Sequence, residues 1–243
     1  MKIVAIIQAR MGSSRLPGKV MLPIGTKSML TRVVRRVQRS QTLDEIVVAT
    51  STEPDDDRVQ EECSVLNVPC FRGSEKDVLD RYYQAAKKFE ANVIVRITAD
   101  CPLIDAEVID RVVIKFMSAK ADYASNCFTR TFPRGMDTEV MTFDALEKAW
   151  KEAKLSFQRS HVTPYIHRNK DIFKLESVTD ATDASAYRWT VDTQEDLALI
   201  RTIFQRLGDH GEFSWRDAQQ LMQFDPRIAA INSNVKQKPM QEG

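Results

Sequence analysis

The residues best suited to chemistry lie in one short stretch near the amino terminus. After an apolar run from Ile3 to Gln8, the chain reads Ala-Arg-Met-Gly-Ser-Ser-Arg-Leu-Pro-Gly-Lys over residues 9–19. This stretch contains three small residues, Gly12, Ser13 and Ser14. Small residues let the backbone turn sharply and direct several N–H groups at one anion. Three cations accompany them: Arg10, Arg15 and Lys19. A strand followed by such a loop predicts a polyphosphate site at the carboxyl edge of a sheet.

Spacing excludes two familiar phosphate loops. The Walker A loop has four residues between its glycines and a Ser or Thr after its Lys, whereas five residues separate Gly12 from Gly18, and Val20 follows Lys19. The Gly-x-Gly-x-x-Gly fingerprint is also absent from this turn. If Mg²⁺ accompanies a nucleotide here, its ligands are therefore expected elsewhere in the chain. An ordinary strand-to-helix connection with surface cations is the alternative.

A carboxylate ends a later apolar run. Residues 93–100 read Val-Ile-Val-Arg-Ile-Thr-Ala-Asp, which predicts a central strand that ends at Asp100. Because the carboxyl ends of parallel strands share one edge, Asp100 is expected beside the phosphates, where Mg²⁺ needs oxygen ligands. A turn-stabilising role is the alternative, but Asp105 already supplies the cap of the next helix.

A second carboxylate follows the segment 186–192, which is expected to return the chain to the sheet. Mg²⁺ on a phosphate commonly uses one or two protein carboxylates, so Asp192 is a second candidate ligand. Asp192 also fits as the N-cap of the next helix, with Glu195 completing a capping box. The two roles do not exclude each other.

The elements that must position these residues alternate in type. Buried strands are expected at 3–8, 45–51, 68–72 and 93–100, and helices at 27–38, 75–89 and 106–118. This order predicts an α/β fold of doubly wound type, with a mostly parallel open sheet and helices on both faces. On helix 27–38, the cluster Arg32, Arg35 and Arg36 is expected to form a solvated face.

The alternation weakens in the second half of the chain. Short strands are expected at 122–126, 140–142 and 172–178, and helices at 143–154, 196–207 and 214–224. Residues 1–226 are expected to form one domain, in which 127–178 is an insertion, and 227–243 a flexible tail.

Composition restricts the class of protein. The 243 residues carry a net charge of +1 with both signs interspersed, which argues against broad nucleic-acid binding. No apolar stretch is long enough to cross a bilayer and no signal peptide is recognisable, so a cytoplasmic protein without membrane contact is expected. The four cysteines contain no Cys-x-x-Cys pair and indicate buried or partly buried thiols rather than zinc ligands or disulfides.

The run from Gln8 to Lys19 resembles the signature loop of the sugar-acid cytidylyltransferases, which make CMP-activated sialic acid and CMP-KDO. It more closely resembles their relatives of the spore coat polysaccharide biosynthesis (SpsF) type. The resemblance implies a Rossmann-like nucleotide-diphospho-sugar transferase fold, CTP as donor and Mg²⁺ dependence. Gln8 is a departure, because the sialic acid and KDO enzymes usually have Pro there, and it leaves the acceptor open.

The resemblance also implies residue roles. The implied nucleotide-binding residues are Ala9, Arg10, Gly12, Ser13, Ser14, Arg15, Lys19, Ser74 and Arg81. Arg10, Lys19 and Asp100 are implied as catalytic, and Asp100 and Asp192 as metal ligands. On physical grounds alone, Ser74 also fits as a helix N-cap and Arg81 as a helix-surface cation.

Two segments resemble the acceptor pocket of that family: Pro-Arg-Gly-Met-Asp-Thr-Glu at 133–139 and Phe-Gln-Arg-Ser-His-Val-Thr-Pro-Tyr at 157–165. The implied substrate-binding residues are Arg134, Gly135, Glu139 and His161. Arg134 is suited to a carboxylate or phosphonate acceptor, although a solvated arginine and a packed histidine fit the sequence as well. The acceptor-side segment 127–178 is also expected to offer a surface for a homodimer.

The sequence therefore predicts transfer of CMP from CTP to a sugar acid or phosphonate-like acceptor, with release of pyrophosphate, in surface polysaccharide or glycan biosynthesis. One alternative is a glycosyltransferase that uses a nucleotide sugar. Such an enzyme is expected to carry Asp-x-Asp at a strand end, and Asp100-Cys-Pro102 does not match it. The other is a non-catalytic nucleotide-binding domain, in which two strand-end carboxylates would be superfluous.

Overall fold

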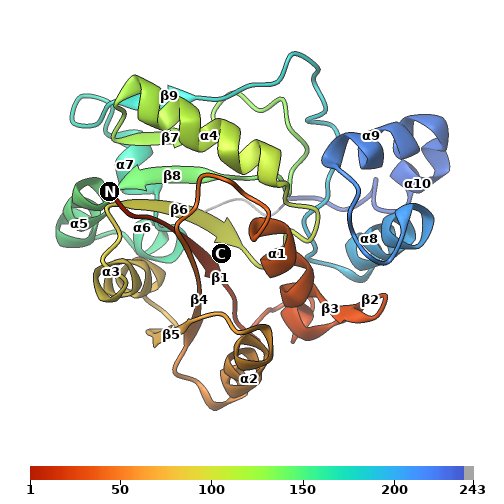
Figure 1. Cartoon of the computed structure of the whole chain (residues 1–243), viewed down its shortest axis with the longest axis horizontal. Coiled ribbons are helices and arrows are strands. Elements are labelled where there is room, and N and C mark those ends of the chain that lie inside the picture. Colours follow the sequence, from red (N-terminus) through yellow and green to blue (C-terminus); the bar gives the residue numbers. More distant parts are fainter. Residues whose placement is uncertain (238–243) are drawn as a thin grey trace.

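A central sheet forms the core of the computed structural model, which describes residues 1–237. Its strands are β1 (Ile3–Gln8), β4 (Glu45–Ser51), β5 (Cys70–Gly73), β6 (Val93–Thr98), β7 (Tyr123–Ser125), β8 (Glu139–Thr142) and β9 (Leu175–Ser177). Their order across the sheet is β5-β4-β1-β6-β8-β7-β9 (Figure 1). Strand β8 runs antiparallel to β6 and β7, and the other neighbouring pairs are parallel. The predicted mostly parallel open sheet is confirmed.

Helices cover both faces of this sheet. They are α1 (Met29–Val37), α2 (Asp57–Leu66), α3 (Val78–Lys88), α4 (Ala106–Ala119), α5 (Phe143–Glu152), α6 (Ser156–His161), α7 (Pro164–Arg168), α8 (Gln194–Leu207), α9 (Trp215–Phe224) and α10 (Pro226–Ala230). Short 3-10 turns, η1 (Lys19–Met21) and η2 (Pro54–Asp56), and a two-stranded ribbon, β2 (Pro23–Ile24) with β3 (Lys27–Ser28), complete the regular structure of residues 1–237.

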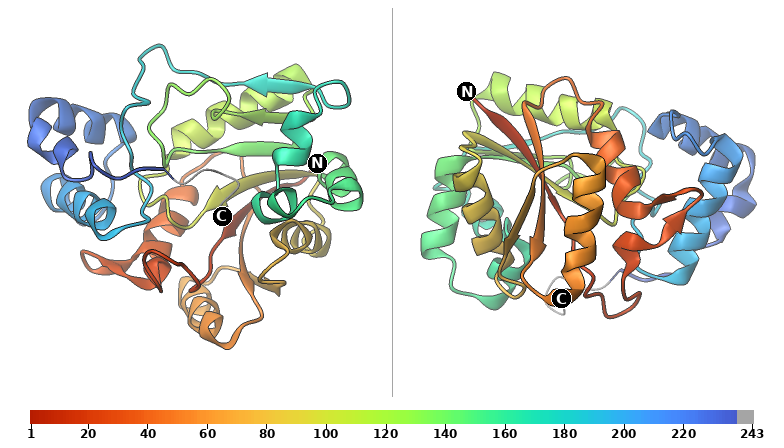
Figure 2. Two further views of the ribbon diagram at one scale, coloured as in Figure 1. Left: turned by 180° about the vertical axis from the view of Figure 1, so that it is seen from behind. Right: turned by 60° about the horizontal axis from the view of Figure 1, so that its bottom comes forward.

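Two apolar cores follow from this layering. Helices α1, α2, α4, α8 and α9 pack on one face of the sheet, and α3, α5 and α7 on the other. The right-hand view of Figure 2 shows α1 and α2 on the opposite side of β1 and β4 from α3 and α5. Strand β1 is apolar throughout because it serves both cores: Ala5 and Ile7 face the first, and Val4 and Ile6 the second.

The strand order places a ligand crevice beside β1. The chain runs outward from β1 to β4 and β5, and then crosses back to add β6 on the other side of β1. The carboxyl ends of β1 and β6 therefore lie at the point where the winding reverses, which is where open α/β sheets bind ligands.

Three predicted features differ in the structure. Residues 186–192 form no strand and make only a single bridge, Arg134 to Arg188; their apolar pattern reflects burial, since Trp189 and Val191 are fully buried. The segment 127–178, predicted as an insertion, contributes β8 and β9 to the central sheet. The predicted tail from residue 227 begins inside α10, and residues 238–243 lie outside the described range.

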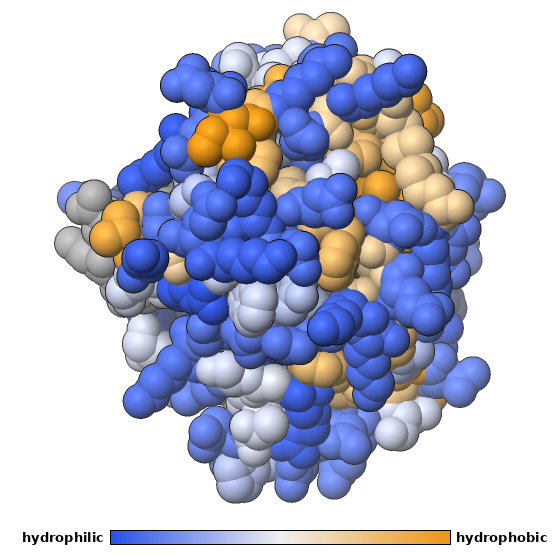
Figure 3. Space-filling view, turned by 90° about the vertical axis from the view of Figure 1, so that its left-hand side faces the viewer, coloured by the Kyte–Doolittle hydropathy of each residue, from blue (hydrophilic) through white to orange (hydrophobic). Residues whose placement is uncertain are grey.

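The surface and the thiols have the character that the composition predicts. The face seen in Figure 3 is mainly hydrophilic, with scattered apolar side chains. Among residues 1–237 no helix combines the length and apolar character needed to span a membrane. All four cysteines are free thiols, buried or partly buried as expected.

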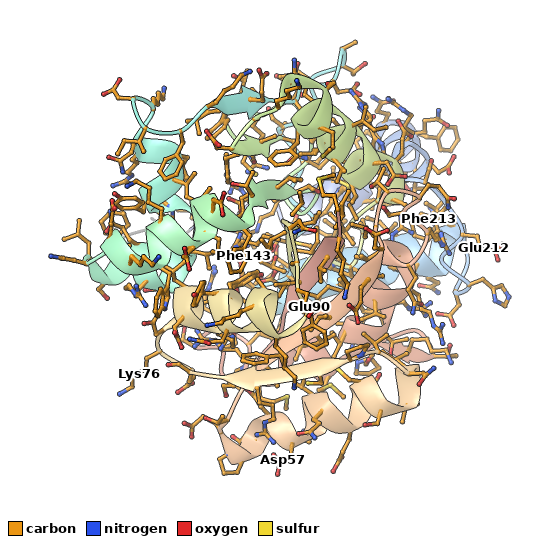
Figure 4. All side chains as sticks on the ribbon, turned by 60° about the vertical axis from the view of Figure 1, so that its left-hand side comes forward. Asp57, Lys76, Glu90, Phe143, Glu212 and Phe213 are labelled. Carbon is orange, nitrogen blue, oxygen red and sulfur yellow. The ribbon has the colours of Figure 1, made fainter. Side chains whose placement is uncertain are left out.

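The predicted solvated arginine face of α1 is wrong for Arg32 and Arg36, which are both buried. Arg36 donates through Nε to the carbonyl of Ile104 (2.6 Å) and through Nη1 to the carbonyls of Gly211 (2.9 Å) and Phe213 (3.0 Å). Its Nη2 pairs with Asp105 at 3.1 Å. Phe213 and its neighbour Glu212, labelled in Figure 4, lie in the loop between α8 and α9. Arg36 thus ties that loop to α1.

We expect Arg36→Ala to lower the free energy of unfolding by about 3 kcal/mol, because it leaves three buried carbonyls without their donor and the Asp105 carboxylate without its cation. Urea denaturation measures the change. The matched control is Arg35→Ala on the same helix, where the side chain is exposed and a change below about 0.5 kcal/mol is expected. Equal effects of the two substitutions would contradict this role of Arg36.

Candidate active site

The loop after β1 is held in a closed turn. Gly18 has φ 68° and donates its N–H to the carbonyl of Met11 at 2.9 Å. Met11 in turn donates its N–H to Asp56 Oδ1 at 2.6 Å. Asp56 is buried and also accepts from the N–H of Ser51 at 3.0 Å. The loop is therefore fixed to the carboxyl end of β4, and Asp56 is a positioning residue for it.

The tip of this loop presents unoccupied donors. Within residues 1–237, the N–H groups of Gly12, Ser13, Ser14 and Arg15 donate to no protein acceptor. A Cβ on Gly12 would lie 3.2 Å from Glu75 Oε1, so the turn also leaves little space for a side chain. Consecutive free N–H groups in a tight turn form an anion-binding concavity. These N–H groups are available to an anion, and phosphate binding by the loop stays a prediction.

The ammonium group of Lys19 joins the two predicted metal ligands. Its Nζ donates to Asp100 Oδ2 at 2.7 Å, to Asp192 Oδ1 at 2.8 Å and to the carbonyl of Val191 at 2.8 Å. The three side chains are largely buried, with exposed fractions of 11% for Lys19, 25% for Asp100 and 17% for Asp192. The amino-terminal loop and the two aspartates therefore meet at one place in the fold, as the sequence predicted.

Both carboxylates are ionised at neutral pH. Burial alone would raise the pKa of Asp100, but the charge and hydrogen bond of Lys19 and the hydroxyl of Thr98 lower it to about 2. Burial likewise opposes ionisation of Asp192, and Lys19 and Arg15 lower its pKa despite the nearby charge of Asp100. For Lys19, the two carboxylates outweigh burial and raise the pKa.

Asp192 is reached by an irregular path rather than by a strand. Val191 donates its N–H to the carbonyl of Asp100 at 2.8 Å, which holds the two carboxylates side by side. The Oδ2 atom of Asp192 accepts from Arg15 at 2.9 Å and from Arg188 at 2.6 Å. The predicted capping role of Asp192 is wrong, because the N-cap of α8 is Thr193, with Asp196 completing the capping box.

Arg10, the third loop cation, does not join Arg15 and Lys19 at the aspartates. It is exposed and faces Glu75 at 3.8 Å, a distance at which the pair contributes little. Arg15 and Lys19 instead bind the aspartates directly. Of the three predicted phosphate cations, two are thus bound to the aspartates and Arg10 is not.

Ser74 and Arg81 are joined by a hydrogen bond. Arg81 is fully buried rather than on a helix surface, and donates to the carbonyl of Ser74 at 2.9 Å. Burial and the charge of Arg10 lower the pKa of Arg81. Ser74 accepts from the N–H of Asp77 at 2.9 Å, but the N-cap of α3 is Asp77 itself. Arg81 thus supports the turn at Ser74, and a nucleotide contact by either residue stays a prediction.

The acceptor-side glycine packs against the segment that carries Asp192. Gly135 has φ 109°, and a Cβ there would lie 2.7 Å from the backbone nitrogen of Thr190. The carbonyl of Arg134 accepts from the N–H groups of Trp189 (2.6 Å) and Thr190 (3.1 Å). The guanidinium of Arg134 is half-buried and pairs with no side chain among residues 1–237. Arg134 is therefore available to a ligand. Gly135 instead allows the close approach of the backbone of residues 189 and 190.

Glu139 does not fit its predicted role as a substrate contact. It is buried, and its carboxylate pairs with Arg96 and accepts from the hydroxyls of Tyr123 (2.5 Å) and Thr163 (2.6 Å). Burial opposes ionisation, yet Arg96 and these hydroxyls lower its pKa. Glu139 thus joins β6, β7 and the start of α7 inside the fold.

His161 ends α6 next to an unusual turn. Val162 is fully buried with φ 72° and ψ −59°, and Thr163 donates its N–H to the carbonyl of His161 at 2.9 Å. This γ-turn is a strained conformation for a β-branched residue. The bond from Thr163 to Glu139 follows directly after it. The strained turn therefore lies beside the buried Glu139 cluster, and substrate binding by His161 stays a prediction.

The carboxylate pair fits a magnesium ion bound to a phosphate. Over residues 1–237 no three His, Cys, Asp or Glu side chains are grouped as a metal site, so the protein offers two carboxylates, Asp100 and Asp192. Ionised oxygens are the ligands that Mg²⁺ prefers, and it commonly takes only one or two from protein when phosphate supplies the rest. The donor set is compatible with the predicted metal.

The mostly parallel sheet, the loop with free N–H groups and the paired carboxylates have the arrangement expected of a nucleotide-binding α/β protein. A family model described as cytidylyltransferase matches residues 4–224. The chain therefore belongs to the cytidylyltransferase family, and the predicted family resemblance is confirmed.

Individual relatives match this chain over 93% or more of its length. A solved cytidylyltransferase from Leptospira borgpetersenii is 37% identical, with a TM-score of 0.91 over 98% of this chain and 100% of its own. The spore coat polysaccharide biosynthesis protein SpsF of Bacillus subtilis is 33% identical over 93% of this chain and 96% of its own. An uncharacterised protein of Methanocaldococcus jannaschii is 44% identical over 100% of this chain and 99% of its own.

We expect Lys19→Met to lower the free energy of unfolding at pH 7 by about 2 kcal/mol, because two neighbouring carboxylates then lack their shared cation. Folding lowers the pKa of both aspartates, so their contribution is present above the unfolded pKa of about 3.9 and is lost as pH falls further. The difference from wild type should therefore shrink below about pH 4.

Denaturation curves at several pH values measure this difference. Lys27→Met is the control, since Lys27 is exposed and forms no ion pair among the described residues. A Lys19→Met effect that stays constant from neutral to acidic pH would show that the carboxylates are not its cause.

Proposed function

We propose that this protein transfers CMP from CTP to a sugar acid or a related anionic acceptor, with release of pyrophosphate. The observation that carries the proposal is the Lys19 ammonium bound to Asp100 and Asp192 beneath a loop with four free N–H groups. Such a site can bind a triphosphate on one side and a divalent cation on the other. A regulatory domain that only bound a nucleotide would have no use for the second carboxylate.

The loop residues bind and align the triphosphate in this proposal. The N–H groups of residues 12–15 receive phosphate oxygens, and Arg10, Arg15 and Lys19 neutralise their charge. An acceptor oxygen then forms a bond to the α-phosphorus, the bond from that phosphorus to the pyrophosphate oxygen breaks, and the acceptor proton passes to solvent. Alignment and charge neutralisation supply most of the acceleration in such a displacement.

Asp100 and Asp192 would hold the metal ion. When bound, Mg²⁺ supplies charge neutralisation on the phosphate oxygens. The phosphates would draw Arg15 and Lys19 away from the carboxylates, which frees oxygens for the metal. We therefore expect metal and nucleotide to bind together, because either one alone leaves charges of one sign unpaired.

The acceptor is proposed to be an anion bound near Arg134. Burial and the neighbouring charge of Arg130 lower the pKa of Arg134, so an anionic group would relieve an unfavourable charge. A carboxylate, phosphate or phosphonate has the matching geometry. The likeness to the Bacillus subtilis SpsF protein supports a role in surface polysaccharide biosynthesis. A homodimer and a cytoplasmic location stay predictions.

Pyrophosphate release tests the reaction. The protein is incubated with CTP, Mg²⁺ and a panel of keto-acid sugars, sugar phosphates and phosphonates, and ATP, GTP and UTP replace CTP in parallel. Release that requires both CTP and an acceptor supports the proposal. Nucleoside diphosphate produced from a nucleotide sugar would indicate a glycosyltransferase instead. Nucleotide binding without turnover across the panel would indicate a domain that only binds the nucleotide.

Asp100→Asn should lower kcat at least about 100-fold, because it removes one charged metal ligand and an interaction that aligns the phosphates. Asp192→Asn should have a similar effect. The control is Asp171→Asn, an exposed carboxylate with no partner among residues 1–237. Near-normal Mg²⁺-dependent turnover by Asp100→Asn would exclude Asp100 as a metal ligand.

A further inference from the structure

Asp196 organises the segment that presents Asp192. It is buried at the start of α8, and its Oδ2 accepts from the N–H groups of Asp192 (3.0 Å) and Thr193 (3.1 Å). Arg188 donates from Nε to Asp196 Oδ1 at 3.0 Å and from Nη2 to Asp192 Oδ2 at 2.6 Å. Asp196 and Arg188 therefore fix the backbone and the carboxylate of Asp192, respectively.

A residue far beyond this segment completes the arrangement. Asn232 is buried, with 5% of its surface exposed, and its Nδ2 donates to Asp196 Oδ1 at 2.8 Å and to the carbonyl of Arg188 at 2.9 Å. Within residues 1–237, Asn232 is the one neutral side chain that forms hydrogen bonds with both Arg188 and Asp196, which are themselves an ion pair. Further along, Gln237 accepts from Nη1 of Arg188.

The fold holds Asn232 firmly in this place. Helix α10 begins after Asp225, which accepts from the N–H of Arg227, and Ile228 on this helix is buried in the first core. The family match ends at Phe224, so α10 and Asn232 lie outside the region matched by the family model. The segment after the family-model match thus supplies a side chain that contacts Arg188 and Asp196.

We propose that Asn232 is a positioning residue for Asp192, acting through Asp196 and Arg188 to set the geometry in which Asp192 holds a nucleotide-bound divalent cation. The inference rests on the proposed role of Asp192 in metal binding. Groups that orient a metal ligand through a hydrogen bond typically contribute 10- to 100-fold to metal affinity. Asn232 makes no contact with Lys19 or Arg15, so binding of the phosphates themselves should not depend on it.

The test compares Asn232→Ala with wild type by isothermal titration of CTP in the presence and absence of Mg²⁺. We expect the enhancement of CTP affinity by Mg²⁺ to fall about 10-fold, with the metal-free affinity unchanged. In turnover, the Mg²⁺ concentration for half-maximal rate should rise, and kcat at saturating Mg²⁺ should largely recover. Ser233→Ala is the control, because the exposed Ser233 hydroxyl donates only to the carbonyl of Ala230 at 3.0 Å.

Asp192→Asn separates the two proposals. If Asp192→Asn loses the enhancement by Mg²⁺ but a folded Asn232→Ala keeps it, the inference on Asn232 is overturned and the metal role of Asp192 stands. If Asp192→Asn keeps the enhancement, the metal role of Asp192 is overturned and the inference falls with it. Should Asn232→Ala fail to fold, Asn232→Ser replaces it, since a serine hydroxyl is too short to reach both partners.

Discussion

The ion pairs of Lys19 are the interaction on which the site depends. Lys19 lies 81 positions from Asp100 and 173 positions from Asp192 in the sequence, yet its ammonium group contacts both carboxylates. Without that cation, two largely buried negative charges would face each other, which is strongly unfavourable at low dielectric. Lys19 therefore ties the amino-terminal loop to the end of β6 and to the segment that precedes α8.

This arrangement also determines how a ligand can enter. Three cations, Arg15, Lys19 and Arg188, neutralise three carboxylates, Asp100, Asp192 and Asp196, so the site is balanced in charge. An anion alone or a metal ion alone would disturb that balance. A metal–triphosphate complex disturbs it less than a free triphosphate does, because the metal cancels part of the phosphate charge. The phosphates then replace the carboxylates as partners of the cations, and the metal replaces the cations as partner of the carboxylates. Charge balance thus favours the complex over the free triphosphate.

Sequence reasoning succeeded where local rules determine the outcome. The apolar runs at β1, β4 and β6 and the position of Asp100 follow from strand periodicity and from the rule that parallel strands end at one edge. It failed for residues whose surroundings come from distant segments. Glu139 and Arg36 are charged residues that are buried in the structure. Nothing in the residues next to them in sequence indicates the partners that offset the cost of burial.

The burial of Arg36 and Arg81 has one physical explanation. Irregular segments leave backbone carbonyls without ladder partners, and buried carbonyls need donors. Arg36 supplies them to the loop between α8 and α9, and Arg81 to the turn at Ser74. Asn232 does the same for the carbonyl of Arg188 on the path to Asp192. Because Asp192 is held by side-chain hydrogen bonds rather than by a strand ladder, its position depends on a few replaceable groups, and single substitutions far from the ligand can shift it.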